Sequence, residues 1–272
     1  MSLVDSHAHL EAVENLEEVL EHAKAAGVGS IVSIGTSLNT SRRAIDIAEK
    51  YSSDDLRIFA TVGMHPFDSK GEIEDKGVEA CMRELTDLAS TSKKIVGIGE
   101  AGLDYYGQGD MRSPTGDTEK EFQKKLFCAQ VKIANDNILP IVVHCRNGWD
   151  EIFQLLSKDS GQPPMLRGVF HSFTGGYNEA KKAVGLGFYI SFSGIVTFEN
   201  AVNIQEAARI VPGELILLET DSPFLSPEPF RGQKNEPTNV KIIASFLAKL
   251  RNIQESDFCT QTTKNAQKAF KL

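Results

Sequence analysis

Two histidines near the start of the chain form the clearest candidate for a chemically active motif. In the run VDSHAHL, which covers residues 4–10, His7 and His9 are two residues apart. Side chains two apart in a strand project to the same face, so the two imidazoles would point the same way. Imidazole is a common ligand of zinc and other first-row metals, which makes the pair a candidate metal site. For this motif alone, the alternative is a hydrogen-bonded pair in a crowded turn.

Further ionisable residues lie where other strands are predicted to end. His7 and His9 close the first strand, His65 the third, Glu100 the fourth, His144 the fifth, His171 the sixth and Asp221 the eighth. Of the six histidines in the chain, only His22 falls in a predicted helix. In an α/β barrel the carboxyl ends of the strands share one mouth, where catalytic groups lie. We therefore expect these seven residues to meet, the alternative being that strand ends simply tolerate polar side chains.

Short β-rich runs alternate with helical patterns along the whole chain. The runs predict strands over 4–10, 28–35, 56–64, 94–100, 138–144, 166–171, 187–193 and 214–219. The patterns predict helices over 14–26, 39–50, 77–90, 118–136, 148–158, 178–186, 201–209, 238–250 and 255–270, with a loop over 107–117. No linker interrupts the series, which predicts one domain over 1–272, a (β/α)8 TIM barrel with its active site at the C-terminal ends of the strands. A doubly wound sheet is disfavoured, because no glycine-rich dinucleotide fingerprint follows the first strand.

Composition limits the class of protein and its surroundings. The 272 residues are 41% hydrophobic and 24% charged, which is ordinary for a globular protein with a sizeable core. The net charge of -8 argues against binding nucleic acid through bulk charge, although bound cations would reverse the local field for a phosphate substrate. The four cysteines form no Cys-x-x-Cys pair, and no signal peptide or membrane span is recognisable, so we expect a cytoplasmic protein with reduced thiols.

Over essentially its whole length the sequence resembles the TatD family of metal-dependent hydrolases, a branch of the amidohydrolase-like barrels. The matching stretches are DSHAHL (5–10), GMHP (63–66), GEAGLDYY (99–106), LPIVVHCR (139–146), GVFHSFTG (168–175), ISFSG (190–194) and LETDSPFL (218–225), followed by Arg231-Gly232 and Asn235-Glu236-Pro237. Two departures are Asn147, where the family often has an aspartate, and Ala101, where a larger apolar residue is common. They bear on substrate preference and not on metal binding.

The resemblance implies two adjacent divalent cations per chain, with Mg, Mn and Zn as the candidates. One cation would be held by His7, His9, Glu100 and Asp221, and the other by Glu100, His144 and His171. Chemistry supports the division, since one carboxylate can bridge two cations about 3.5–4 Å apart. An ion pair with Arg146, or a contact with a helix terminus, is the alternative for Glu100.

The resemblance further implies a deoxyribonuclease that trims DNA from the 3′ end, with Asp221 and Glu100 as catalytic residues. Asp221 would accept a proton from the attacking water and pass it to the leaving oxygen. The same site could instead attack an ester or amide, such as the ester of a D-aminoacyl-tRNA. A binding protein built on an inactive barrel is the alternative outside enzymes. Oligomeric state is left open, with a monomer slightly favoured.

Several residues near the predicted mouth have both a functional and a structural interpretation. His65 either meets substrate or orders the loop before Pro66, and Asp104 either orients a ligand histidine or caps a loop. Arg146 either clamps a phosphate through its fork or forms a salt bridge on the barrel rim. The loop after the eighth strand is a phosphate-binding position in many barrels, and here it carries Arg231, Lys234 and Asn235, which either bind phosphate or are only solvated on the surface. Three aromatic residues either stack on bases or pack loops, namely Tyr105, Tyr106 and Phe224.

Overall fold

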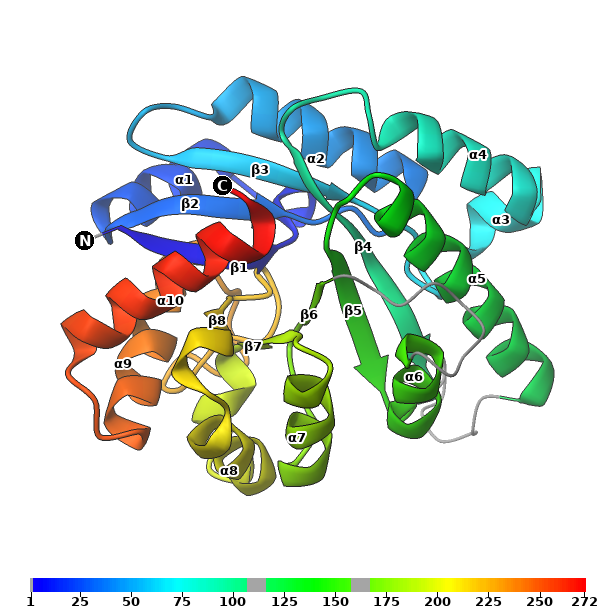
Figure 1. Cartoon of the computed structure of the whole chain (residues 1–272). Coiled ribbons are helices and arrows are strands. Elements are labelled where there is room, and N and C mark those ends of the chain that lie inside the picture. Colours follow the sequence, from blue (N-terminus) through cyan, green and yellow to red (C-terminus); the bar gives the residue numbers. More distant parts are fainter. Residues whose placement is uncertain (1, 107–115, 158–166) are drawn as a thin grey trace.

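The computed structural model describes residues 2–106, 116–157 and 167–272. In these residues eight parallel strands pair in chain order, and helices alternate with them (Figure 1). The strands are β1 (Leu3–Ala8), β2 (Val28–Ser33), β3 (Arg57–Val62), β4 (Ile95–Asp104), β5 (Ile141–Arg146), β6 (Gly168–Phe170), β7 (Tyr189–Phe192) and β8 (Ile216–Leu218). The predicted (β/α)8 barrel is confirmed.

Ten α-helices and four short 3-10 turns connect the described strands. The helices are α1 (Leu16–Ala25), α2 (Leu38–Tyr51), α3 (Lys70–Lys76), α4 (Val78–Leu88), α5 (Asp117–Asp136), α6 (Trp149–Leu156), α7 (Tyr177–Gly185), α8 (Val202–Ile210), α9 (Val240–Leu250) and α10 (Glu255–Phe270). The turns are η1 (Leu10–Ala12), η3 (Gly194–Thr197), η4 (Gly213–Leu215) and η5 (Pro237–Asn239). Among the helices that the structure describes, none is long and apolar enough to cross a bilayer.

The ring of strands closes where the end of β1 meets the segment after β8. Ala8 forms a parallel bridge with Ser222, and the Asp221 N–H donates to the His7 carbonyl at 2.9 Å. Deeper in the barrel, the buried Asp5 carboxylate accepts hydrogen bonds from Thr220 N at 2.8 Å and Thr220 Oγ at 2.5 Å. The closure therefore brings residues from the two ends of the chain to the same part of the mouth.

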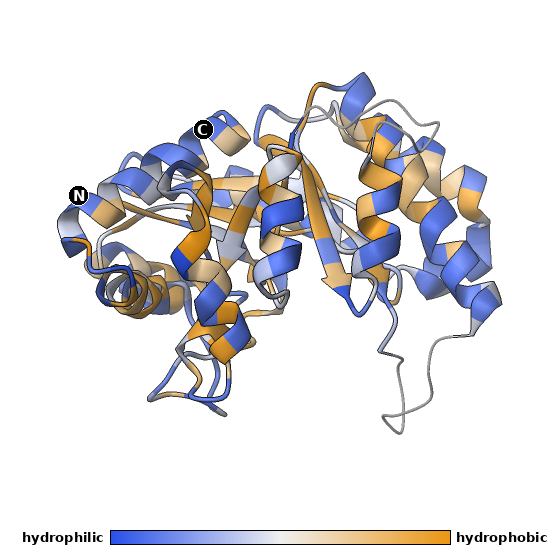
Figure 2. Cartoon of the chain, turned by 60° about the horizontal axis from the view of Figure 1, so that its bottom comes forward, coloured by the Kyte–Doolittle hydropathy of each residue, from blue (hydrophilic) through white to orange (hydrophobic). Residues whose placement is uncertain are grey.

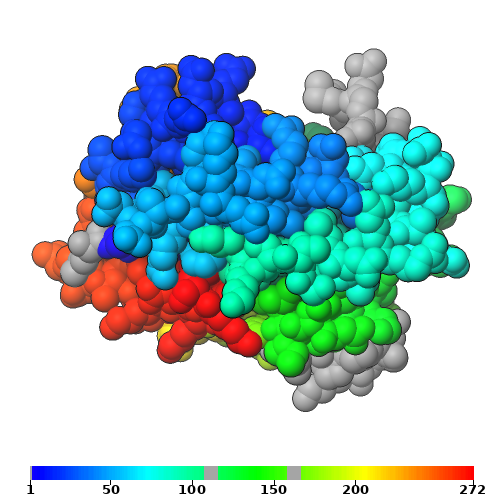
Figure 3. All heavy atoms as spheres, turned by 90° about the horizontal axis from the view of Figure 1, so that it is seen from above, coloured from blue at the N-terminus to red at the C-terminus, as the bar shows by residue number. Residues whose placement is uncertain are grey.

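The bottom of the barrel is filled by apolar side chains and covered by α10. Each of six strands contributes one buried aliphatic side chain to this interior, from Val4, Val32, Val96, Val142, Val169 and Leu217. Ala266, Ala269 and Phe270 of α10 pack against them. In Figures 1 and 3 α10, coloured red, lies beside the blue N-terminal segments, consistent with its contacts to β1. The opposite end of the barrel, where the strands finish, is where the cavity described below opens.

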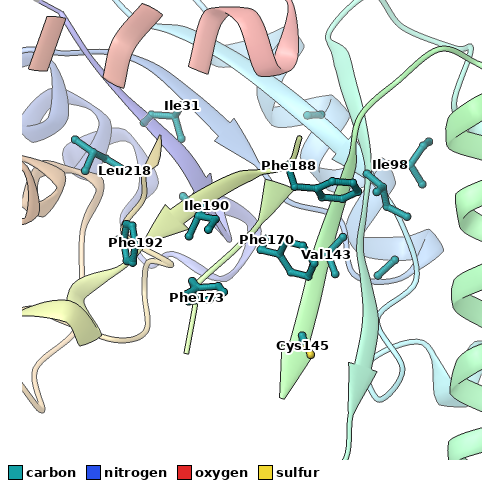
Figure 4. Close-up of a cluster of buried hydrophobic side chains, with 14 of the residues drawn as sticks. Ile31, Ile98, Val143, Cys145, Phe170, Phe173, Phe188, Ile190, Phe192 and Leu218 are labelled. Atoms are coloured by element: carbon teal, nitrogen blue, oxygen red, sulfur yellow. The ribbon is translucent and has the colours of Figure 1, made fainter. Parts of the chain in front are cut away.

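A second apolar layer lies between the strands and the surrounding helices. Phe170, Phe188, Ile190 and Val143 are buried in this layer, and Figure 4 shows them gathered around neighbouring strands. Figure 2 shows the corresponding pattern in hydropathy, with mostly hydrophobic strands and helices that alternate hydrophobic and hydrophilic positions. This alternation is what a helix needs when one face packs on a sheet and the other meets water.

The structure differs from the predicted boundaries in three places. Residues 70–76, where the sequence predicted neither helix nor strand, form α3, whose Glu72 carboxylate accepts hydrogen bonds from the Leu38 and Asn39 N–H groups at the start of α2. β4 continues to Asp104, beyond the predicted end at Glu100. β5 covers Ile141–Arg146 and not 138–144, because Ile138 has a left-handed φ of 55°. Most of the predicted loop over 107–117 lies outside the described residues.

Close approach of β4 to β5 depends on Gly102. A Cβ atom there would lie 1.8 Å from the His144 carbonyl oxygen, so Gly102→Ala must push the two strands apart. We expect this change to lower the free energy of unfolding by about 1–3 kcal/mol. Urea denaturation measures this loss.

The matched control is Gly71→Ala in α3, where a Cβ atom would meet nothing within 4 Å. Alanine is favoured over glycine in a helix by roughly 0.5–1 kcal/mol, so this variant should be no less stable than the parent. Equal stability of the parent and the Gly102→Ala variant would contradict the close packing of β4 on β5.

Candidate metal centre

The predicted site residues meet at the carboxyl end of the barrel. A cavity of about 780 Å³ opens there. Its lining includes six of the seven residues expected to converge, namely His9, His65, Glu100, His144, His171 and Asp221. The seventh, His7, is fully buried directly behind them. Side chains from residues more than 200 positions apart are thus gathered at one mouth.

Four donor atoms form a group on the β1 and β8 side. His7 Nε2 lies 3.3 Å from His9 Nε2, 3.4 Å from Glu100 Oε2 and 3.4 Å from Asp221 Oδ1. His9 Nε2 lies 3.6 Å from the same Glu100 oxygen and 3.2 Å from the same Asp221 oxygen. Four ligands about 2.0–2.2 Å from a tetrahedral ion are separated by roughly 3.3–3.6 Å. The group therefore fits a small divalent cation.

A second group shares Glu100 and lies towards β5 and β6. Glu100 Oε1 lies 2.8 Å from both His144 Nδ1 and His171 Nε2, and these two ring nitrogens are 3.2 Å apart. Adjacent ligands of a six-coordinate ion with bonds of about 2.0–2.1 Å are separated by roughly 2.8–3.0 Å. The two oxygens of one carboxylate thus serve two groups of ring nitrogens, which is the arrangement of a bridging ligand.

The backbone before Glu100 aims its side chain into the mouth. Gly99 has a φ of 111°, and the pairing of β4 with β5 shifts register between Ile98 and Ala101. Such a bulge re-aims the side chain that follows it and is typical of strands beside active sites. Burial by itself raises the pKa of the Glu100 carboxyl, but His171 and His144 hold that pKa well below its usual value.

Asp221 is directed by an unusual backbone conformation. Its φ of 59° is left-handed, which aspartate tolerates better than most residues. Burial raises the pKa of the Asp221 carboxyl, but His9 and His7 lower it by more, so the pKa is below its usual value. For His9, burial lowers the pKa, but the hydrogen bond with Asp221 raises it to about 9. In the cation-free protein a proton on His9 therefore balances the negative charge of the nearby carboxylates, which a bound cation would otherwise balance.

A carboxylate lies behind four of the five histidines at the mouth, on the ring nitrogen that faces away from Glu100. These pairs are His9 Nδ1 with Glu11 at 3.8 Å, His65 Nδ1 with Asp68 at 3.7 Å, His144 Nε2 with Asp104 at 3.4 Å and His171 Nδ1 with Glu219 at 3.5 Å. A carboxylate in this position would fix the tautomer and orientation of His9, His144 or His171 as a metal ligand, whereas His65 Nδ1 accepts a hydrogen bond from Phe67 N instead.

Asp104 lies where both of its predicted roles would place it. Its Oδ2 faces His144, and its Oδ1 accepts a hydrogen bond from Tyr106 N at 2.9 Å. Glu11, Asp68 and Glu219 were not predicted. Glu219 had a recognisable signal, because it is charged and two residues before Asp221 at the end of a buried strand.

His65 lies at the edge of the second group. Its Nε2 is 3.9 Å from Glu100 Oε1, and its ring packs edge-on against His144 with 4.6 Å between centroids. Its Nδ1 also accepts a hydrogen bond from Phe67 N at 3.3 Å, which orders the loop as the structural interpretation predicted. Burial lowers the pKa of His65 to about 4.

Arg146 faces the cavity from the end of β5. Its guanidinium lies over the Tyr106 ring, 3.8 Å from the centroid, and both residues line the cavity. Phe224, after β8, lines it too and is about half exposed. Tyr105 is buried and packs the loop.

The loop after β8 contributes less to the cavity than expected. Arg231 is not among the described lining residues, and its guanidinium lies over the Phe198 ring at 4.1 Å. Lys234 pairs with Glu14 at 2.6 Å on the surface. The prediction for Asn235 was wrong in placing it with phosphate-binding groups, because its buried amide donates to the Thr220 and Phe224 carbonyls at 2.8 and 2.6 Å.

Comparison with known proteins gives consistent matches along the whole chain. The family model described as TatD related DNase matches residues 4–271. The uncharacterized metal-dependent hydrolase YabD of Bacillus subtilis is 37% identical over 273 residues, and the match covers 99% of each chain. YcfH of Escherichia coli K12, described in the same words, is 32% identical over 278 residues, covering 100% of this chain and 97% of YcfH. The crystal structure of YJJV, a TatD homologue from Escherichia coli, has a TM-score of 0.86 and 26% identity, covering 99% of this chain and 98% of that one.

The barrel, its clustered imidazoles and carboxylates, and relatives described as metal-dependent hydrolases together place the chain in the class of metal-dependent hydrolases. The match over residues 4–271 makes the assignment more specific. The chain belongs to the TatD-related DNase family.

The low pKa of His65 has a consequence for stability in acid. Its folded-state pKa of about 4 lies below its ordinary value of 6.5, so the unfolded chain takes up this proton first. Stability that His65 contributes as a neutral ring is therefore lost as the pH falls from about 6.5 to about 4. Urea unfolding of chelator-treated protein should show a shallower loss over this range in His65→Gln than in the parent. Parallel curves for the two proteins would contradict the burial of a neutral His65.

Proposed function

We propose that this chain is a deoxyribonuclease that hydrolyses phosphodiester bonds with two divalent cations bound at the mouth of the barrel. The observation that carries the proposal is the Glu100 carboxylate, whose two oxygens each face a separate group of ring nitrogens. The family's description as DNases supports the choice of DNA as substrate. Trimming from a 3′ end is the form of the reaction that we infer.

The residues divide between the two cations by their distances. His7, His9 and Asp221 would hold one cation with Glu100 Oε2, and His144 and His171 would hold the other with Glu100 Oε1. Bound there, a pair of divalent cations would lower the pKa of a water molecule and place positive charge near the phosphoryl oxygens. Mg, Mn and Zn are compatible with this mixed set of nitrogen and oxygen donors.

Asp221 is the residue that we assign to proton transfer. Its Oδ1 lies 3.4 Å from His7 Nε2 and 3.2 Å from His9 Nε2, and its carboxyl is ionised because its pKa is lowered. It accepts the proton of the attacking water and delivers it to the leaving oxygen. Glu100 keeps the two halves of the site at a fixed separation.

The cavity walls offer contacts for a nucleotide on two sides. Arg146 presents a guanidinium fork that suits a phosphate, and its stacking on Tyr106 limits the orientations of the fork. Phe224 offers an exposed ring for a base and follows β8, which is opposite β4 in an eight-stranded barrel. His65 lines the same cavity, with its Nε2 3.9 Å from Glu100 Oε1, and we assign it a contact with the substrate. We assign Arg231 a weaker role, as a cation on the rim that attracts the strand beyond the cavity.

Asp221→Asn tests the site most simply. The amide keeps the shape of the side chain but is a far weaker proton acceptor, so we expect kcat on single-stranded DNA to fall by about 10²–10⁴-fold while the fold survives. Turnover is measured on a labelled oligonucleotide, with circular dichroism to check folding. Chelation should abolish activity in the parent, and Lys132→Ala on the exposed face of α5 serves as the control with unchanged turnover. Retained turnover in Asp221→Asn would show that the chemistry lies elsewhere.

Arg146→Lys tests the phosphate contact. Lysine keeps the charge but loses the planar fork and the stacking on Tyr106, so we expect kcat/KM to fall by about 10–100-fold, mainly through KM. Steady-state kinetics with oligonucleotides of several lengths measures the effect. An unchanged KM would contradict a direct contact between Arg146 and the substrate.

Parallel assays of an oligonucleotide and a D-aminoacyl-tRNA test the bond that is cleaved. We expect metal-dependent cleavage of the oligonucleotide by the purified protein. Cleavage of the ester alone, lost in Asp221→Asn, would keep the site but overturn the phosphodiester substrate.

A further inference from the structure

Two buried glutamines of α5 hold the backbone at the ends of two neighbouring strands. Gln130 Oε1 accepts from Met64 N at 2.8 Å, and Gln130 Nε2 donates to the Met64 carbonyl at 2.9 Å. Gln123 does the same for Asp104, with 2.8 Å to the N–H and 3.1 Å to the carbonyl. Each carboxamide therefore pairs with both backbone groups of one residue, as a neighbouring strand would.

The spacing and burial of the two glutamines show that α5 presents both to the barrel. They are seven residues apart, which is close to two helical turns, so they lie on the same face. Both are fully buried. A buried carboxamide needs partners for its donor and its acceptor, and each of these finds them on a strand end. The helix is therefore tied to fixed points at the ends of β3 and β4.

Both fixed points are next to His144. Asp104, held by Gln123, places its Oδ2 3.4 Å from His144 Nε2. Met64, held by Gln130, precedes His65, whose ring packs on His144 with 4.6 Å between centroids. The side chain of His144 is 18% exposed, more than any other proposed ligand, so the packing of the barrel constrains it least.

We propose that Gln123 and Gln130 are positioning residues for the second cation group, formed by Glu100 Oε1, His144 and His171. Gln123 fixes the carboxylate that orients the His144 ring, and Gln130 fixes the loop whose His65 packs against that ring. The first group takes His7, His9 and Asp221 from β1 and the segment after β8, which are joined by the bond from the Asp221 N–H to the His7 carbonyl, so it depends on α5 less than the second group does. This inference rests on the proposed two-cation site.

Calorimetric titration of chelator-treated protein with Co²⁺ tests the proposal without an activity assay. His9→Ala and His144→Ala assign the two binding steps to the first and second groups. In Gln123→Met and Gln130→Met we expect the second-group step to weaken by about 10–100-fold, as when outer partners of metal ligands are removed, and the first-group step to stay within about twofold.

Asn265→Leu is the matched control. Asn265 is a buried carboxamide on α10 that donates to the Gly213 and Ile216 carbonyls at 2.7 and 2.8 Å, at the opposite end of the barrel. Its loss removes the same kind of bond between a helix and the backbone at the start of β8, so both binding steps should stay unchanged. If Gln123→Met does not fold, Gln123→Glu keeps the oxygen that accepts from Asp104 N, and a smaller weakening of the same step is expected.

The outcomes distinguish the positioning role of the two glutamines from the two-cation site itself. Unchanged second-group affinity in both glutamine variants, or equal weakening of both steps, would overturn the positioning role. Failure of the parent protein to bind two cations would overturn the two-cation site itself and this inference with it. Selective weakening of the second-group step, with Asn265→Leu unaffected, is the result that supports the proposal.

Discussion

The organisation of the mouth depends on one buried carboxylate. Glu100 is 5% exposed, and its two oxygens lie within 2.8–3.6 Å of four ring nitrogens. A buried charge is costly unless it is paired, so these donors stabilise the carboxylate only if they carry protons or share a cation with it. In the cation-free protein the raised pKa values of His9, His144 and His171 favour protons on these rings, and under the proposed function those protons would leave when a metal binds.

The barrel supplies the geometry that this cluster needs. Parallel strands bring residues from β1, β4, β5, β6 and the segment after β8 to one mouth, although they are far apart in the sequence. Local backbone features then set the direction of each side chain, through the bulge at Gly99 and the left-handed conformation of Asp221. Behind the ligands, carboxylates such as Asp104 and Glu219 face the remaining ring nitrogens. The strands thus position the site, and the mouth gathers ionisable side chains that suit a bound cation.

Much of the fold and of the candidate site could be predicted from the sequence. Alternation of apolar runs with helical patterns predicted the barrel, and the positions of His7, Glu100 and Asp221 at strand ends predicted their convergence. The sequence did not predict α3, whose position depends on a tertiary contact of Glu72 with the start of α2. It also missed Gln123 and Gln130, because a glutamine in a helix looks like a solvated residue until its buried partners are known. Asn235 was assigned to phosphate binding because it lies in the loop after the eighth strand, and its bonds to the Thr220 and Phe224 carbonyls are tertiary contacts that the sequence does not show.

The most direct measurement is a crystal structure of protein loaded with Mn²⁺, with the ions located by anomalous scattering. The account predicts two peaks roughly 3.5–4 Å apart. One would lie among His7, His9 and Asp221, the other between His144 and His171, and both would contact Glu100. Manganese bound elsewhere, or a single ion that leaves one oxygen of Glu100 without a metal, would contradict the bridging role on which the proposed chemistry rests.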